Sequence, residues 1–242
     1  MQTLYAARKY LSHDPEAKST LDAMDEAKTT SNQDRLHELS KHSCFRVKRF
    51  VARNTNTHPD TLHDMRNDPD DHIRWRVALN PNTKPDTLHD MRNDPDHEVR
   101  FEVAGHENTR HDTLHDMRFD KNSNVRSEVA LNPKTQPDTL HDMRNDPDPS
   151  VRRRIILHQN TRFNTRHDMR NDPDPSVRRC VAKYSNTSDD TLHDMRNDED
   201  RIVRIKVAEH PNTRYDTLHD MRNDPHPDVR DRVEKRLKEL GY

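Results

Sequence analysis

The sequence predicts an all-α solenoid of about eight repeats of 26 residues, with a helical cap at each end. A segment of the form Thr-Leu-His-Asp-Met-Arg-Asn-Asp recurs along the chain. Its leucine returns at 26-residue steps or multiples of them, at Leu62, Leu88, Leu114, Leu140, Leu192 and Leu218. Self-similarity at a period of roughly 20–50 residues is typical of solenoids. No segment has the alternation of a strand, so the repeats should be helical.

The composition is misleading when it is read without the repeats. Charged residues make up 36% of the chain and hydrophobic residues 28%, a balance that usually indicates disorder. Here the apolar residues recur at fixed positions, and stacked repeats need only a thin core. The net charge of −2 excludes the whole chain as a polyanion binder, so any nucleic-acid surface would have to be local.

The cysteines and the amino terminus indicate a reducing compartment. Cys44 and Cys180 lie about five repeats apart, too far for a disulfide. Residues 1–12 lack the apolar run of a secretory signal. The longest aliphatic run, residues 155–157, is too short to span a bilayer. We therefore expect a cytoplasmic protein without a membrane partner, and the oligomeric state stays open.

The chain divides into caps and repeats. Residues 1–28 are expected to form an amino-terminal helical cap, with one helix over Thr3 to Leu11 and a second starting at Pro15 behind Asp14. The solenoid should cover residues 29–233, and residues 234–242 should end a carboxy-terminal cap. A degenerate repeat occupies residues 29–50. Full repeats begin at Val51, Val77, Val103, Val129, Ile155, Val181 and Val207.

Each repeat contains the signals of two short helices of about nine residues. In the first helix, Thr83 is the expected N-cap, and Asp86 takes the capping-box position three residues later. Leu88 and Met91 form its buried pair. Asn93 should adopt the left-handed conformation that ends a helix, which would explain how the chain turns with two glycines in all.

The second helix follows a proline. Pro95 blocks continuation of the first helix, and Asp96 should cap the next one. The apolar positions of the second helix are Val99, Val103 and Ala104. Helices this short are marginal alone, so stacking between repeats must supply the stability.

Two runs carry a resemblance to known repeat families. Residues 143–152, Met-Arg-Asn-Asp-Pro-Asp-Pro-Ser-Val-Arg, resemble the middle of a HEAT repeat, and residues 129–140 resemble the leucine-rich repeat variant. The resemblance covers residues 29–233 and implies a right-handed superhelix of α and 3₁₀ helices. Iron–sulfur members of the variant family carry a cysteine cluster near the amino terminus. This chain has only Cys44 there, so we expect no cofactor.

HEAT repeats often contain an Asp and an Arg six residues apart that form a ladder between neighbours. The resemblance assigns that structural role here to Asp68 and Arg74, Asp94 and Arg100, Asp120 and Arg126, Asp146 and Arg152, Asp172 and Arg178, Asp198 and Arg204, and Asp224 and Arg230. The degenerate repeat has His42 and Lys48 instead, so the ladder is in doubt at that end.

The recurrent His-Asp pair is the candidate for chemistry. It occurs seven times, from His63-Asp64 to His219-Asp220, whereas an enzyme needs one site. Adjacent helix residues do not face each other, and no third ligand for a metal is evident. We therefore expect a solvated outer row with no metal and no catalytic residue. The Asn or His that follows each second helix, such as Asn80 and His106, should bind the free carbonyls of helix ends.

One repeat departs from the leucine pattern. Arg166 stands where the other repeats have a buried leucine, and Phe163 precedes it by three residues. We expect Phe163 to fill the gap and this layer to be the weakest. Leucine at position 166 should then raise the melting temperature.

The positions that vary while the frame repeats are the candidate binding residues. They lie on the second helix, opposite Ile73 and Val77, on what would be the concave surface of a HEAT-like stack. The sets are Trp75, Arg76, Leu79; Phe101, Glu102, Gly105; Ser127, Glu128, Leu131; Arg153, Arg154, Leu157; Arg179, Cys180, Lys183; and Ile205, Lys206, Glu209. A constant frame with a variable lining favours a non-enzymatic scaffold that binds an extended protein. Drift at exposed positions is the alternative reading of this variation.

A local basic patch supports a second function. Residues 151–183 contain nine Arg and Lys against three Asp. The candidate anion contacts are Arg153, Arg154, Arg162, Arg166, Arg179 and Lys183. The alternative function is therefore a nucleic-acid-binding solenoid, which would lose affinity steeply with salt.

Overall fold

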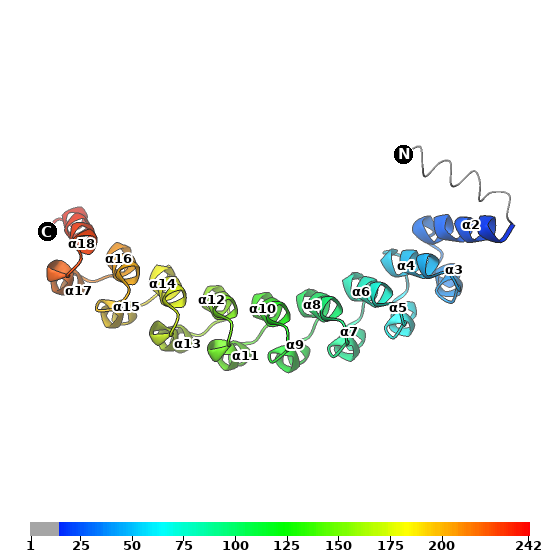
Figure 1. Cartoon of the computed structure of the whole chain (residues 1–242), viewed down its shortest axis with the longest axis horizontal. Helices are drawn as coiled ribbons and strands as arrows, with labels where there is room; N and C mark the ends of the chain where they lie inside the picture. The colour runs from blue at the N-terminus through cyan, green and yellow to red at the C-terminus, as the bar shows by residue number, and fades with distance from the viewer. Residues whose placement is uncertain (1–14) are drawn as a thin grey trace. The chain divides into compact units, whose positions relative to one another are not determined.

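The computed structural model describes residues 15–242, and the expected helix at Thr3 to Leu11 and the cap at Asp14 lie outside this range. Every regular element in the described part is a helix. The chain forms two compact units, Met1–Lys134 and Thr135–Tyr242. In each unit the helices alternate between two layers, with the first helices of the repeats in one and the second helices in the other (Figure 1).

The first unit contains a cap helix and successive helix pairs. Its helices are α2 (Pro15–Thr29), α3 (Gln33–Leu39), α4 (Phe45–Arg53), α5 (Pro59–Met65), α6 (Asp71–Leu79), α7 (Pro85–Met91), α8 (His97–Gly105), α9 (His111–Met117) and α10 (Ser123–Leu131). The cap helix α2 packs against α4 and buries Ala23 and Ala27.

The second unit continues the same pairing with tighter helix ends. Its elements are α11 (Pro137–Asp142), η1 (Met143–Asn145), α12 (Pro149–Leu157), α13 (Phe163–Asp168), η2 (Met169–Asn171), α14 (Pro175–Lys183), α15 (Asp189–Met195), α16 (Arg201–Glu209), α17 (Tyr215–Asp220), η3 (Met221–Asn223) and α18 (Pro227–Glu239). The η elements are single 3₁₀ turns at the ends of first helices.

The repeated apolar positions form the core, as the sequence predicts. Leu88 is 0% exposed and Met91 3%, and on the second helix Val99, Val103 and Ala104 are each 0% exposed. Successive second helices pack directly on one another within each unit, α4 on α6 and α6 on α8 in the first. The second helices therefore carry most of the contact between repeats.

The predicted start of the first helix is wrong. Helix α7 begins at Pro85, and its N-cap is Lys84 in an extended conformation, which proline imposes on the residue before it. Thr83 is fully buried, and its hydroxyl donates to the carbonyl of Val77. Thr83 therefore closes the preceding second helix instead of opening the next one. The first helices are consequently shorter than expected, with seven residues in α7.

The predicted end of the first helix is also wrong. No non-glycine residue among those described has a positive φ, so Asn93 is not left-handed. Arg92 stays helical at φ −60° and ψ −21°, and the Asp94 amide donates to the Met91 carbonyl at 3.0 Å. The helix thus tightens into a 3₁₀-type turn, which any residue can adopt. Asp96 then caps α8 as predicted, accepting from the amide of Glu98 at 2.7 Å.

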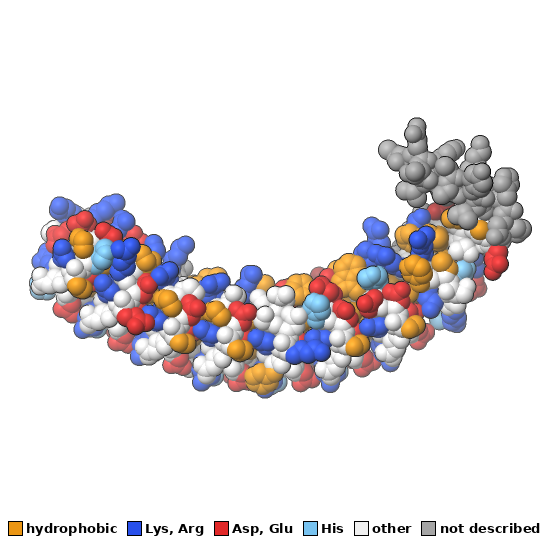
Figure 2. Space-filling view, in the orientation of Figure 1, with side chains coloured by type: hydrophobic (Ala, Val, Ile, Leu, Met, Phe, Trp, Pro, Cys, Tyr) orange, Lys and Arg blue, Asp and Glu red, His pale blue; other side chains and the backbone are white. Residues whose placement is uncertain are grey.

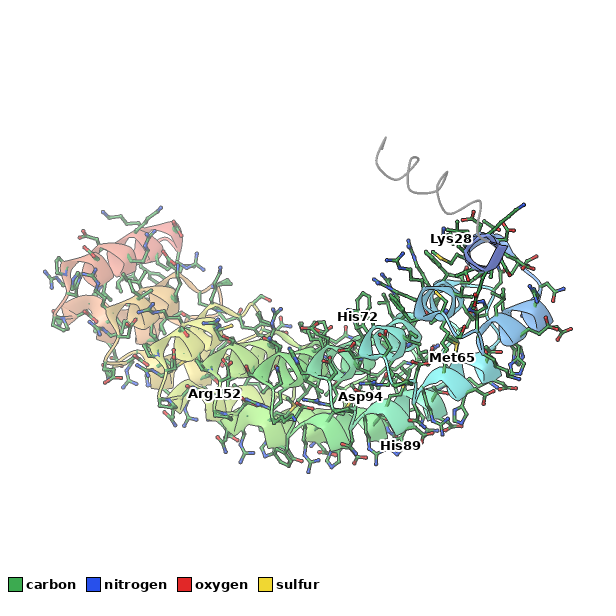
Figure 3. The ribbon with its side chains drawn as sticks, turned by 45° about the vertical axis from the view of Figure 1, so that its right-hand side comes forward. Lys28, Met65, His72, His89, Asp94 and Arg152 are labelled. Carbon is green, nitrogen blue, oxygen red and sulfur yellow. The ribbon has the colours of Figure 1, made fainter. Side chains whose placement is uncertain are left out.

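A buried ladder of ion pairs joins neighbouring repeats. Arg74 donates to the Asp94 carboxylate, at 2.7 Å from Nε and 3.0 Å from Nη2, and to the Asp68 carbonyl at 2.9 Å from Nη1. The carboxylate therefore comes from the next repeat, while the aspartate six residues earlier contributes its backbone oxygen. The same arrangement holds for Arg100 with Asp120, Arg152 with Asp172, Arg178 with Asp198, and Arg204 with Asp224. Figure 3 labels Asp94 and Arg152.

The ladder is not interrupted in the degenerate repeat. Lys48 occupies the arginine position there, and its Nζ lies 2.9 Å from the carboxylate of Asp68. At the other positions, the hydrogen bond to the aspartate carboxylate raises the pKa of the arginine, as it does for Arg100 and Arg152. This effect outweighs burial, which lowers the pKa. Arg126, at the end of the first unit, is buried and donates to the Asp120 carbonyl at 2.8 Å.

The His-Asp pairs are not the solvated row that the sequence suggests. Nδ1 of His63 lies 3.0 Å from the hydroxyl of Thr87 in the next repeat, and that of His89 lies 2.9 Å from Thr113 (Figure 3). The aspartates are more exposed, and Asp90 pairs with Arg66 of the preceding repeat at 3.1 Å. Both members of the motif therefore bind neighbouring repeats, which gives its recurrence a structural reason.

The Asn or His after each second helix binds carbonyls, as expected. The Asn80 amide donates to the carbonyls of Ala52 and Asn54 at 2.8 and 3.0 Å. His210 makes the equivalent bond to the Tyr184 carbonyl at 2.9 Å, and its Nδ1 accepts from the Asn212 amide at 3.1 Å. Asparagine and neutral histidine can replace each other here because each has a donor for a helix-end carbonyl and an acceptor for the amide two residues later.

The account of Arg166 from the sequence is wrong. Phe163 is 55% exposed and fills no gap. Arg166 is half-buried and donates to the carbonyls of Ile156 and His158 at 2.9 and 2.7 Å. An Asn at position 184 would donate to the same two carbonyls, as Asn80 does in its repeat. The chain has Tyr184 instead, and the centre of its ring lies 4.3 Å from the Arg166 guanidinium. The arginine and the tyrosine therefore replace a leucine and an asparagine together.

This exchange predicts that Arg166→Leu lowers stability. The variant leaves two helix-end carbonyls without their donor, which should cost about 1–3 kcal/mol in urea unfolding. Adding Tyr184→Asn should return most of the loss, because asparagine can donate to the same carbonyls. A single variant as stable as the parent would show that the arginine contributes nothing here.

The buried imidazole of His210 predicts acid sensitivity. Burial lowers its pKa, so below an unfolded-state pKa of about 6.5 the unfolded chain binds a proton that the folded chain resists. Stability should therefore fall as the pH falls through this range. His210→Asn keeps the hydrogen bonds and removes the titration. Urea unfolding at about pH 7.5 and 5.5 should show a smaller acid loss for the variant than for the parent. Equal losses would contradict the assignment.

Candidate interaction surface

The variable positions lie on the solvent side of the second helices, because Ile73, Val77 and their equivalents are buried on the other side. The most exposed of the candidate residues are Leu79 at 42%, Leu157 at 60%, Arg154 and Lys183. The others are half-buried, namely Trp75, Arg76, Phe101, Glu102, Arg153, Arg179 and Lys206. Each unit thus presents its own row of these side chains.

Trp75 contacts two other residues of the row in the first unit. Its indole Nε1 donates to the Glu102 carboxylate at 3.0 Å, and the Arg76 guanidinium lies 4.4 Å from the centre of its ring. Burial lowers the pKa of Arg76, and the positive charges of Arg49 and Arg53 lower it further. The Nε of Arg76 is buried without a hydrogen-bond partner.

Helix α4 contributes a part of this surface that was not predicted from the sequence. Arg49, Phe50 and Arg53 stand one repeat before Trp75, Arg76 and Leu79 in the same frame. The signal was present, but the degenerate repeat lacks the recurrent motif that marks the frame elsewhere. Lys28 of α2 lies over the Phe50 ring at 4.4 Å. Figure 2 shows hydrophobic and basic side chains together over α4 and α6.

A groove runs beside Trp75. It encloses ≈ 310 Å³ and is lined by Arg49, Asp71, His72, Trp75, Asp96 and Glu98. Among the described residues, one group of potential metal ligands occurs at its edge, where atoms of Asp70, Asp71 and His72 lie within 4.8 Å of one another. The Asp70 carboxylate already caps α6 by accepting from the His72 amide at 2.9 Å. Its position therefore follows from the helix cap alone.

The basic patch of the second unit is mostly bound within the chain. Arg179 makes a bidentate pair with Asp200, which lowers the pKa of that carboxyl to about 2. Arg162 pairs with Asp138, Arg166 binds two carbonyls, and Arg153 donates to Ser176 at 3.0 Å. Arg154 and Lys183 are the candidates without a partner among the described residues. Few of these cations are therefore available to an anionic ligand.

Other features of the described residues carry little chemistry. Cys44 and Cys180 are free, and burial raises the pKa of the Cys180 thiol, which disfavours the reactive thiolate. Phe119, which the sequence analysis did not single out, is 70% exposed with Arg118 4.3 Å from its ring. It stands where other repeats have Asn, which is the signal that could have found it. Within residues 15–242, no helix combines the length and the apolar character that crossing a membrane requires.

One solved structure supports the architecture. No protein-family model matches the sequence, and no curated protein matches it either. Among solved structures, a leucine-rich repeat variant is similar at a TM-score of 0.69 and 25% identity, over 85% of this chain and 82% of that one.

Two further similarities are weaker. A condensin subcomplex of S. pombe gives a TM-score of 0.41 at 15% identity, over 91% of this chain and 37% of that one. A designed armadillo repeat protein gives 0.26 at 9% identity, over 86% and 100%. The chain is thus an all-helical repeat solenoid, similar over most of its length to a leucine-rich repeat variant.

Proposed function

We propose that this chain is a non-enzymatic scaffold that binds a protein partner through the exposed side of its second helices. The proposal rests on a difference between the side chains that repeat along the chain and those that vary. The residues that repeat, such as His89, Arg100 and Asn80, bind neighbouring repeats. The second-helix residues that vary face solvent, and they include the aromatic side chains that often dominate binding energy in protein interfaces.

The recurrent groups that could suggest catalysis have structural partners. Imidazoles of the His-Asp pairs lie against threonines of the next repeat. In one example, His193 Nδ1 is 3.0 Å from the hydroxyl of Thr217. Exposed leucines support binding instead, because Leu79 and Leu157 add apolar area beside the variable charges. Since most cations of residues 151–183 are already paired, we favour a protein over a nucleic acid as the partner.

This proposal predicts where substitutions weaken binding. A partner captured on the immobilised chain from a cell extract treated with nuclease would be purified and its binding measured. Trp75→Ala with Phe101→Ala should weaken that binding at least about tenfold, mainly through faster dissociation, because aromatic anchors carry much of the energy.

Asn67→Ala with Asn93→Ala provides the control, because both residues are exposed and follow first helices. This variant should bind as the parent does. The proposal fails if capture depends on nucleic acid. It also fails if the control variant loses binding while the aromatic variant keeps it.

A further inference from the structure

Three arginines converge on the second-helix surface of the first unit. Helices α4 and α6 pack together and bring Arg49 and Arg53 close enough to Arg76 to repel its charge. Neither Arg49 nor Arg53 forms an ion pair with any described residue. Five arginines of the buried ladder differ from them in facing a carboxylate of the next repeat, as Arg100 does at 2.6 Å from Asp120.

The arginine cluster, Arg49, Arg53 and Arg76, therefore has an electrostatic cost that the described chain offsets in part. Glu102 is the acidic group that counters Arg76, but its carboxylate also accepts the hydrogen bond of Trp75. The buried Nε of Arg76 is left without an acceptor. A carboxylate is the group that such arginines bind in a bidentate manner.

Aromatic rings lie among these charges. Trp75 stacks against Arg76, and Phe50 lies under Lys28. The groove beside Trp75 has room for side chains of a ligand, and its lining also includes the acidic side chains of Asp71, Asp96 and Glu98. A nucleic-acid backbone carries negative charge along its whole length and would be repelled by these carboxylates. A peptide can instead place carboxylates on the arginines and an apolar side chain in the groove.

We propose that the arginine cluster, together with Phe50 and Trp75, binds an acidic extended segment of a protein partner that also carries an apolar side chain. The inference rests on the proposed function and specifies its partner. Carboxylates of the segment would pair with the guanidinium groups of the cluster. The apolar side chain would lie against Trp75, and the aromatic contact would supply affinity while the charges supply specificity and a fast association rate.

The single tryptophan of the chain provides the readout, because Trp75 lies inside the proposed site. The probe is a synthetic peptide with one Glu-Glu-Phe unit between Gly and Ser residues, titrated into the full chain while tryptophan fluorescence is followed. Binding should change the emission, and the same peptide with Gln in place of Glu should bind at least about tenfold more weakly, since it lacks the charge-assisted bonds.

Two charge variants distinguish binding at this site from non-specific electrostatic attraction of the peptide to the chain. Arg49→Gln with Arg53→Gln should weaken the peptide at least about tenfold, because both lost groups contact its carboxylates. Lys41→Gln with Arg46→Gln removes the same charge from exposed positions of the same unit and should change the affinity less than about twofold. Equal losses in the two variants would overturn the proposal.

Two other results would also overturn the proposal, and they differ in whether the proposed function fails with it. If the acidic peptide does not bind, while a captured protein still depends on Trp75 and Phe101, the protein scaffold stands and the acidic partner is wrong. If an oligothymidylate of matched length binds at the cluster more tightly than the peptide, the surface binds nucleic acid and both proposals fail.

Discussion

The buried pairing of an arginine in one repeat with an aspartate in the next is the constraint on which the fold depends. First helices such as α7 have seven residues and second helices such as α8 have nine, lengths that are marginal in isolation. Arg100 spans the interval by bonding the Asp94 carbonyl on one side and the Asp120 carboxylate on the other. Each guanidinium thus fixes both the turn of its own repeat and its register with the next one.

That arrangement explains why so polar a chain folds around a thin core. The constant residues form rows between repeats, with Arg and Asp inside, His and Thr at the first helices, and Asn or His at the ends of the second helices. The solvent side of the second helices has no part in these rows and is free to vary. Variation there changes the surface with little effect on the frame, which suits a family of binding scaffolds.

The repeat period, the helical class, the buried leucines and valines and the Asp96 cap could all be predicted from the sequence, because each is a local signal repeated many times. The partner of a ladder arginine could not, since spacing within one repeat does not reveal which neighbour supplies the carboxylate. Thr83 was misassigned because its hydroxyl donates to the buried carbonyl of Val77 and does not cap the next helix. Asn93 was misassigned because the helix ends in a 3₁₀-type turn, which needs no left-handed residue. The part of the candidate surface on α4 was missed because its repeat is degenerate, and Arg166 because its compensating residue, Tyr184, lies elsewhere in the sequence.

A pair of double-mutant cycles tests the role of the ladder most directly. One cycle removes Arg152 and Asp172, whose side chains are 9% and 4% exposed, and the other removes Arg170 and Asp194, at 22% and 45%. Unfolding in urea should give a coupling energy of about 2 kcal/mol or more for the buried pair and below about 1 kcal/mol for the outer one. A buried pair coupled no more strongly than the outer pair would contradict the account, and the apolar core alone would then hold the repeats together.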